Sequence, residues 1–144
     1  KDDIHHIENG IKNALVSGPS GAYPVIGIKI FIEKIDYEEN SQSPLVLEAA
    51  LNLATTYLLR DTGTEVLEPI MKVEIDSPTG YTGGIIGDLQ SRNGTVLEVE
   101  KKVDTDKIVA KVPLKQLFGY TTIIRNLSAG KASFTMEFLE FNRC

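Results

Sequence analysis

The sequence contains one cysteine and two histidines, and each scarcity argues against a class of site. Cys144 is the last residue, so these 144 residues hold neither a disulfide framework nor a thiolate metal cluster. His5 and His6 are adjacent, and adjacent residues do not share a helix face. We therefore predict solvated histidines rather than metal ligands. No stretch approaches the roughly 18 uninterrupted apolar residues of a membrane helix, so no membrane partner is predicted.

Basic residues are also in the minority. The chain carries 15 Lys and Arg against 20 Asp and Glu, which gives a net charge of −5. Nucleic-acid-binding proteins usually present a basic face, so the composition argues against nucleic-acid binding over a wide surface. Any contact with RNA must be local, or secondary to contacts made by other parts of a larger protein.

Motifs for nucleotide binding and catalysis are missing as well. Two glycine-rich stretches, Gly18-Pro19-Ser20-Gly21 and Gly80-Tyr81-Thr82-Gly83-Gly84, lack the Gly-Lys-Ser/Thr that completes a phosphate loop. The second stretch lies at a predicted helix start, where an anion could bind weakly. Neither histidine is near a plausible serine nucleophile in the sequence, and the acidic residues 36–39 match no calcium loop. We predict no catalytic, cofactor-binding or metal-binding residue.

The second part of the chain, residues 64–144, contains two β-α-β units in series. The predicted strands are 67–75, 95–100, 107–112 and 131–138, with helices that end at Arg92-Asn93-Gly94 and at Ala129-Gly130. Two such units form a ferredoxin-like βαββαβ sandwich, in which both helices cover one face of a four-stranded antiparallel sheet.

Two details of this sandwich are predicted from its side chains. The first helix is expected to start at Ser77 and Pro78, and we interpret its glycines as close packing of the helix on a strand: Gly80, Gly83, Gly84 and Gly87. In the last strand, Phe134, Met136 and Phe138 share one face, so they are predicted to lie in the core.

The first part of the chain, residues 1–63, has less apolar surface to bury than the second part. Apolar spacing predicts a helix over 3–17 with Asp3 as its N-cap, and alternating isoleucines predict a long strand over 25–35. A second helix is predicted from Ser43 and Pro44 to Asp61-Thr62-Gly63, with a buried stripe at Leu47, Leu51, Ala54 and Leu58. One strand cannot satisfy its own backbone, and two alone are marginal. We therefore expect residues 1–63 to be the tail of a larger α/β domain whose other strands lie upstream.

Several motifs carry a resemblance to a known family. They are Leu67-Glu68-Pro69-Ile70-Met71-Lys72-Val73-Glu74, then Gly87-Asp88-Leu89 with Arg92 and Gly94, then Val112-Pro113-Leu114 with Phe118-Gly119-Tyr120 and Ile124-Arg125, then Gly130 with Met136-Glu137-Phe138. Together they resemble the C-terminal domain, domain V, of elongation factor G. The earlier runs Gly10-Ile11, Ser17-Gly18-Pro19 and Tyr23-Pro24-Val25 resemble the second half of domain IV of that family.

The resemblance implies an α+β chain in two parts. Residues 1–63 would be the C-terminal half of domain IV, a partial α/β unit like ribosomal protein S5 domain 2. Residues 64–144 would be domain V, the ferredoxin-like sandwich. The positions of domain V that match the family motifs are Gly87, Asp88, Arg92, Gly94, Phe118, Gly119, Tyr120 and Arg125.

Membership of this family implies a translational GTPase that binds the ribosome, with rRNA and ribosomal proteins of both subunits as partners. Domain IV would reach the decoding region of the small subunit, and domain V would lie near the GTPase-associated centre of the large subunit. GTP and Mg²⁺ are then expected on an upstream G domain, and no cofactor is expected within these residues.

The loop before Ser43 indicates a branch of the family. Its candidate ribosome-contacting tip residues are Tyr37, Glu38, Glu39, Asn40 and Ser41. Elongation factor G carries a Tyr-His-Asp-Val-Asp-Ser-type loop, and here Glu38 stands in place of the histidine. The phosphates of mRNA and tRNA would repel a carboxylate where a histidine could donate to them. The run Lys34-Ile35-Asp36-Tyr37-Glu38 is more similar to the mitochondrial group, elongation factor G 2 or ribosome-releasing factor 2.

That similarity implies ribosome recycling in the mitochondrial matrix, with ribosome recycling factor as a further partner. Simple drift of the tip residues would leave tRNA–mRNA translocation during elongation as the alternative, with the cytoplasm as the alternative location. An alternative from another class is a free-standing ferredoxin-like module that binds a small ligand. A P-loop GTPase domain in the preceding sequence would favour the translation factor.

Overall fold

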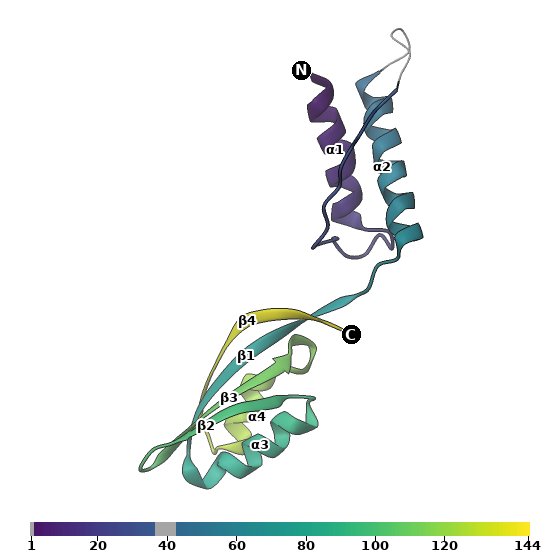
Figure 1. Ribbon diagram of the computed structural model, residues 1–144. Helices are drawn as coiled ribbons and strands as arrows, with labels where there is room; N and C mark the ends of the chain where they lie inside the picture. The colour runs from purple at the N-terminus through teal and green to yellow at the C-terminus, as the bar shows by residue number, and fades with distance from the viewer. Residues whose placement is uncertain (1, 37–42) are drawn as a thin grey trace. The chain divides into compact units, whose positions relative to one another are not determined.

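The computed structural model describes residues 2–36 and 43–144, which form two compact units, Lys1–Glu65 and Val66–Cys144 (Figure 1). We call them the N-terminal and the C-terminal unit and describe each by itself. The elements, in chain order, are α1 (Asp2–Ser17), α2 (Pro44–Thr62), β1 (Leu67–Pro78), η1 (Thr79–Tyr81), α3 (Thr82–Ser91), β2 (Thr95–Lys101), β3 (Thr105–Pro113), η2 (Leu114–Gln116), α4 (Tyr120–Leu127) and β4 (Ser133–Arg143).

The N-terminal unit is built on the packing of α1 against α2. Gly10 permits the close approach of the two helices, because a Cβ at this position would lie 2.6 Å from the carbonyl oxygen of Glu48. The contact buries Ala14 of α1 and Leu59 of α2. Helix α2 starts with proline in its first turn and ends at Gly63, whose φ is +80°. These two predicted boundaries of α2 are confirmed.

Three predictions for this unit are wrong. Helix α1 already begins at Asp2, so Asp3 lies inside the helix and is not its N-cap. Residues 25–35 form no strand, because the described residues of this unit offer no partner strand, and isolated strands leave their backbone groups unpaired. In α2 the exposed residues include Ala54 and Leu58, while Thr55 and Leu59 are buried. The second half of the predicted stripe is therefore displaced by one residue, whereas Leu47 and Leu51 of its first half are half-buried.

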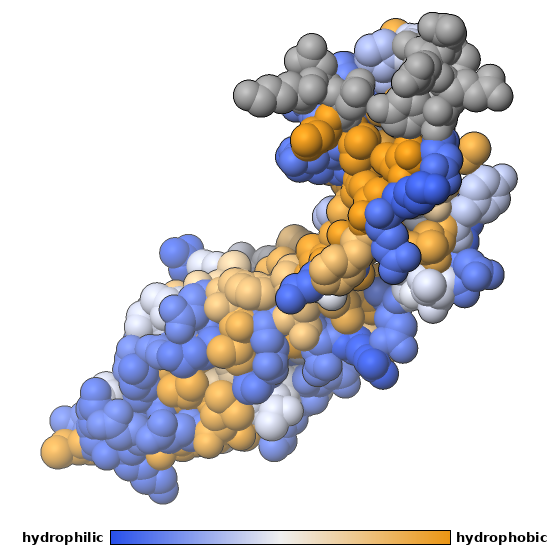
Figure 2. Space-filling view, turned by 45° about the horizontal axis from the view of Figure 1, so that its top comes forward, coloured by the Kyte–Doolittle hydropathy of each residue, from blue (hydrophilic) through white to orange (hydrophobic). Residues whose placement is uncertain are grey.

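The unpaired segment leaves apolar side chains on the surface. Phe31 is 82% exposed, and Ile26, Ile28 and Ile32 are exposed as well. Figure 2 shows apolar surface gathered on the N-terminal unit. Monomeric proteins rarely expose large contiguous apolar patches, so this side of the unit fits the expectation that further strands cover it.

The C-terminal unit is a four-stranded sheet in the order β2-β3-β1-β4, with every neighbouring pair antiparallel. Helices α3 and α4 cover one face of this sheet (Figure 1). β-Branched residues alternate along the central strands and point toward the helices, where side chains of both layers form the core: Val73, Ile75, Ile85, Leu89, Ile108, Ala110, Val112, Leu117, Tyr120 and Ile124. The predicted ferredoxin-like βαββαβ sandwich is confirmed.

The glycines of the first helix do not have the predicted role. Ser77 and Pro78 end β1, and α3 begins only at Thr82 after the short η1 turn. A Cβ placed on Gly80, Gly83, Gly84 or Gly87 would meet no atom within 4 Å. Our interpretation as close helix–strand packing is therefore wrong, because these glycines lie on the outer side of the unit.

The predicted core face of β4 is only partly buried. Phe134 packs edge-on against Tyr120, with ring centroids 5.2 Å apart. Met136 and Phe138 occupy the same face but are 47% and 53% exposed. Among the described strands, β4 lies at the edge of the sheet beside β1 alone, so the core covers its first part and leaves the rest open. The core prediction holds for Phe134 and is wrong for the other two.

Candidate functional site

Two of the family-motif positions form an ion pair at the end of α3. Arg92 Nε donates to Asp88 Oδ2 at 2.8 Å, and one terminal nitrogen of Arg92 donates to the carbonyl oxygen of Gln116 at 3.0 Å. Both side chains are about four-fifths buried, at 21% and 19% exposure. Because Gln116 belongs to η2, the guanidinium connects α3 to the segment that leads into α4. The Asp88 carboxylate beside it raises the pKa of Arg92, so the brace keeps its charge.

A third motif position, Tyr120, lies beneath this brace. The Arg92 guanidinium carbon is 5.2 Å from the centroid of the Tyr120 ring, within the range of a cation–π contact. The ring is 1% exposed, and its hydroxyl has no hydrogen-bond partner within bonding geometry among the described residues. Burial, helped by the charge of Asp88, raises the pKa of the Tyr120 hydroxyl well above its ordinary value. The tyrosine thus acts as a neutral core residue.

Two motif glycines have backbone roles. Gly119 adopts a left-handed conformation, φ +71°, directly before α4. Gly94 donates its N–H to the Leu89 carbonyl oxygen at 2.8 Å after α3, and a Cβ there would lie 2.6 Å from the same oxygen. Five of the eight predicted positions, Asp88, Arg92, Gly94, Gly119 and Tyr120, therefore hold the sandwich together.

The other three motif positions lie on the surface. Phe118 is 76% exposed, although its neighbour Leu117 is 5% exposed and Tyr120 only 1%. Gly87 is exposed on α3 and Arg125 is exposed on α4. Among the described residues, Arg125 takes part in no ion pair. Gly119 is exposed as well, so Gly87, Phe118, Gly119 and Arg125 are the predicted domain V positions that lie open on the surface.

The tip-loop prediction cannot be placed in the same way. Tyr37, Glu38, Glu39, Asn40 and Ser41 lie outside the described residues. Their proposed contact with the ribosome stays a prediction from the sequence.

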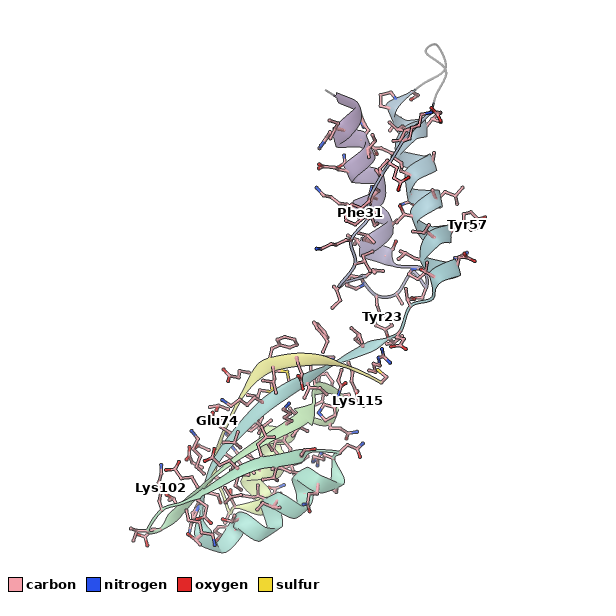
Figure 3. All side chains as sticks on the ribbon, in the orientation of Figure 1. Tyr23, Phe31, Tyr57, Glu74, Lys102 and Lys115 are labelled. Atoms are coloured by element: carbon pink, nitrogen blue, oxygen red, sulfur yellow. The ribbon has the colours of Figure 1, made fainter. Side chains whose placement is uncertain are left out.

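The sheet face opposite the helices carries an ion-pair network that the sequence analysis did not identify. Glu74 lies on β1 (Figure 3). Its carboxylate accepts from Lys107 at 2.8 Å and from Lys72 at 2.9 Å, and Lys72 also donates to Glu137 at 3.2 Å. The two lysines lower the pKa of Glu74 to about 2. Charged residues alternate along β1, and this pattern is visible in the sequence. Which residues pair with them depends on strand register, so the sequence did not reveal the network.

Acid is expected to weaken this network in a defined window. Because the folded-state pKa of Glu74 is below its ordinary value of 4.5, its contribution to stability is present above pH 4.5 and is lost as the pH falls toward about 2. Glu74→Gln should remove this part of the acid sensitivity. The measurement is the urea-unfolding midpoint of the C-terminal unit between pH 2 and 6, followed by the NMR methyl signals of core residues such as Val73.

The matched control is Glu98→Gln, on the same sheet face. Glu98 forms no ion pair among the described residues, so this variant should keep the acid sensitivity of the unaltered chain. Equal pH dependence of the two variants would contradict the assigned role of Glu74.

The two histidines differ from each other and from our prediction. His6 Nδ1 lies 2.5 Å from Glu48 Oε1 across the α1–α2 contact, so the prediction of a solvated residue is wrong for His6. The hydrogen bond from His6 lowers the pKa of Glu48. His5 is exposed, as predicted. Within residues 2–36 and 43–144, no cluster of three or more His, Cys, Asp or Glu could hold a metal ion. The helices described there are too short or too polar to cross a membrane.

Both units of the chain match parts of known proteins. The family model for elongation factor G, domain IV, matches residues 1–63, and the model for the elongation factor G C-terminus matches residues 65–144. Elongation factor G of Ruegeria sp. is 40% identical over 99% of this chain, and that of Thermotoga neapolitana is 41% identical over 98%. The chain spans 20% of the length of each relative.

A solved structure shares the fold. A crystal structure from Thermus thermophilus, described as that of ttk003000868, matches 99% of this chain with a TM-score of 0.92 and 29% identity, and the match covers 22% of that protein. The family models match nearly every residue, in the order domain IV and then C-terminus. The chain therefore belongs to the elongation factor G family and comprises its domain IV and C-terminal regions.

Proposed function

We propose that this chain is the ribosome-binding C-terminal part of a translational GTPase. The single observation that supports this most strongly is that the family models for domain IV and for the C-terminus match adjacent parts of one chain. The relatives are called elongation factor G and are about five times longer than the chain. The GTP and Mg²⁺ sites would belong to the part of the protein outside these 144 residues.

The C-terminal unit is suited to a mechanical role in such a factor. Its core is continuous across both layers, and the Asp88–Arg92 brace fixes α3 to η2. A body of this kind moves as a rigid piece, so a displacement at one end is passed to the other. The net charge of −5 is compatible with ribosome binding, because several domains of the full factor would share the docking.

Within this function we propose ribosome recycling rather than translocation. The support is Glu38, which places a carboxylate where the elongation factor carries a histidine near phosphate groups. The same likeness supports ribosome recycling factor as a partner and the mitochondrial matrix as the location. The bacterial relatives named above are equally compatible with translocation in a cytoplasm. A free-standing ligand-binding module has less support, because both units match one translation factor.

We expect the full-length protein to split post-termination ribosomes when ribosome recycling factor and GTP are present. Light scattering measures the splitting, and omission of GTP is the control. The same protein should support little poly-peptide synthesis in a translocation assay. Glu38→His should leave splitting unchanged, because in recycling the loop only has to avoid tRNA. Efficient poly-peptide synthesis without splitting would contradict the recycling proposal.

A further inference from the structure

Helix α2 of the N-terminal unit is poor in charge. Its 19 residues include three charged ones, Glu48, Arg60 and Asp61, and residues 49–59 contain none. Glu48 is turned toward α1, where it pairs with His6. A helix with apolar residues on every side is normally buried on every side. Much of α2 is nevertheless exposed, although its composition is that of a buried helix.

The exposed apolar residues of α2 form a stripe with regular spacing. Val46, Ala50, Leu53 and Tyr57 follow one another at intervals of four, three and four residues, so they lie on one side of the helix. Val46 and Tyr57 are 61% exposed, Leu53 is 56% exposed, and Ala50 is exposed as well. Arg60 comes three residues after Tyr57, on the same side of the helix, and is also exposed. We call these five residues the outer stripe.

The outer stripe is separate from the other two apolar sides of α2. With 3.6 residues per turn, its centre lies about 170° from Thr55 and Leu59, the buried residues of α2. It lies about 100° from the centre of the stripe predicted in the sequence, to which Leu47 and Leu51 belong. Figure 3 shows the Tyr57 ring on the side of α2 that faces away from α1. Strands that covered the predicted stripe would therefore leave the outer stripe exposed.

We propose that the outer stripe binds an amphipathic helix of a partner protein. The partner would belong to the ribosome assembly of the proposed function, on which this inference rests. Intervals of three and four residues are those of a seam between two helices, in which the side chains of one helix fit between those of the other. From Val46 to Tyr57 the seam would be about 17 Å long at 1.5 Å per residue. Ala50, in the middle, lets the partner helix approach closely.

Charge favours a protein over RNA as the partner. Residues 49–59 offer no cation to a phosphate backbone, and phosphate contacts supply much of the affinity in nucleic-acid binding. Apolar residues at helical spacing are instead the anchors of helix recognition between proteins. Arg60 lies at the end of the outer stripe, so the partner helix should carry a carboxylate opposite it. Tyr57 is the residue type that contributes most at protein interfaces.

Photo-crosslinking in the full-length protein tests this contact. p-Benzoylphenylalanine is introduced at Leu53, and the protein is irradiated in a splitting reaction that contains ribosomes, ribosome recycling factor and GTP. We expect mass spectrometry to find crosslinks to a protein, at residues three or four apart in an amphipathic helix. The matched control carries the same group at Val16, which is 71% exposed on α1 and has the polar Lys12 and Asn13 one turn before it. It should give no such crosslink.

A binding measurement with single substitutions gives the size of the effect. Tyr57→Ala should weaken binding of the full-length protein to ribosomes by about 5- to 30-fold, the range for an important interface side chain. Val16→Ala is the control and should bind like the unaltered protein. Both side chains are largely exposed, so neither change should affect folding. Unchanged NMR methyl signals of Ala14 and Leu59 confirm that the N-terminal unit remains folded.

The outcomes separate this inference from the proposed function. If the unaltered protein does not bind ribosomes, the proposed function is wrong and the partner helix is ruled out with it. If the protein binds, crosslinks from Leu53 to rRNA or to another part of its own chain overturn the inference alone. Crosslinking no stronger than from Val16 does the same. Equal binding of Tyr57→Ala and Val16→Ala would also show that the outer stripe has no partner in this assembly.

Discussion

Replacement of Tyr120 by alanine is expected to destabilise the C-terminal unit by about 3–5 kcal/mol, the usual cost of removing a large buried ring. The ring is 1% exposed, packs edge-on against Phe134 and supports the Arg92 guanidinium. The change would leave a cavity below the Asp88–Arg92 brace at the junction of α3 and α4. Urea unfolding followed by the NMR methyl signals of Ile75 and Ile108 measures the loss within this unit alone.

Tyr120→Phe separates the ring from its hydroxyl. Within the part of the chain that the structure describes, the buried hydroxyl has no hydrogen-bond partner in bonding geometry, so its removal should cost nothing or stabilise the unit by up to about 1 kcal/mol. A loss with Tyr120→Phe close to that with Tyr120→Ala would show that the hydroxyl matters more than the packing of the ring. That result would contradict the structural role assigned to this motif position.

Gly94→Ala is the second change with a large expected effect. A Cβ at Gly94 would lie 2.6 Å from the Leu89 carbonyl oxygen and 3.1 Å from Val112 Cγ2. The oxygen belongs to the backbone at the end of α3 and accepts the hydrogen bond from Gly94 N–H, so it cannot move without disturbing the helix end. Overpacking of this kind costs about 1–3 kcal/mol. The unfolding midpoint of the C-terminal unit measures the effect.

Gly87→Ala is the matched control for this prediction. Gly87 lies inside α3, and a Cβ there would meet open space. Alanine at an exposed helix position is more favourable than glycine by about 0.5–1 kcal/mol, so this variant should be more stable than the unaltered chain. A loss of stability in both variants would contradict this prediction, because it would require contacts of Gly87 on the outer face of α3 that the structure does not contain.

Periodic patterns in the sequence predicted the secondary structure of the sandwich well. Alternation along β4 is typical of a strand, because side chains of a strand point to opposite faces in turn. Pro44 and Gly63 predicted the ends of α2 correctly, because the backbone conformations that proline and glycine favour do not depend on distant residues. The prediction failed for residues 25–35, where alternation was equally clear. A strand needs a partner, and a sequence pattern cannot reveal whether the partner is present.

The family motifs show a similar limit for the candidate site. Asp88, Phe118 and Tyr120 are all recognisable from the resemblance, yet the sequence does not separate the braced interior residues from the exposed ring. That separation follows from packing, since Leu117 and Tyr120 are fixed in the core and Gly119 turns the chain between them.

The sequence by itself determined the βαββαβ order, the family and the absence of a recognisable catalytic motif, because these depend on local periodicity and on residues close together in the chain. The tertiary structure decided the distribution of charge and the accessible face. Carboxylates from β1, β2 and β4 meet on one side of the sheet only through strand register, which depends on hydrogen bonds between distant segments. On the helix side, the exposed charged residue of α3 and α4 is Arg125.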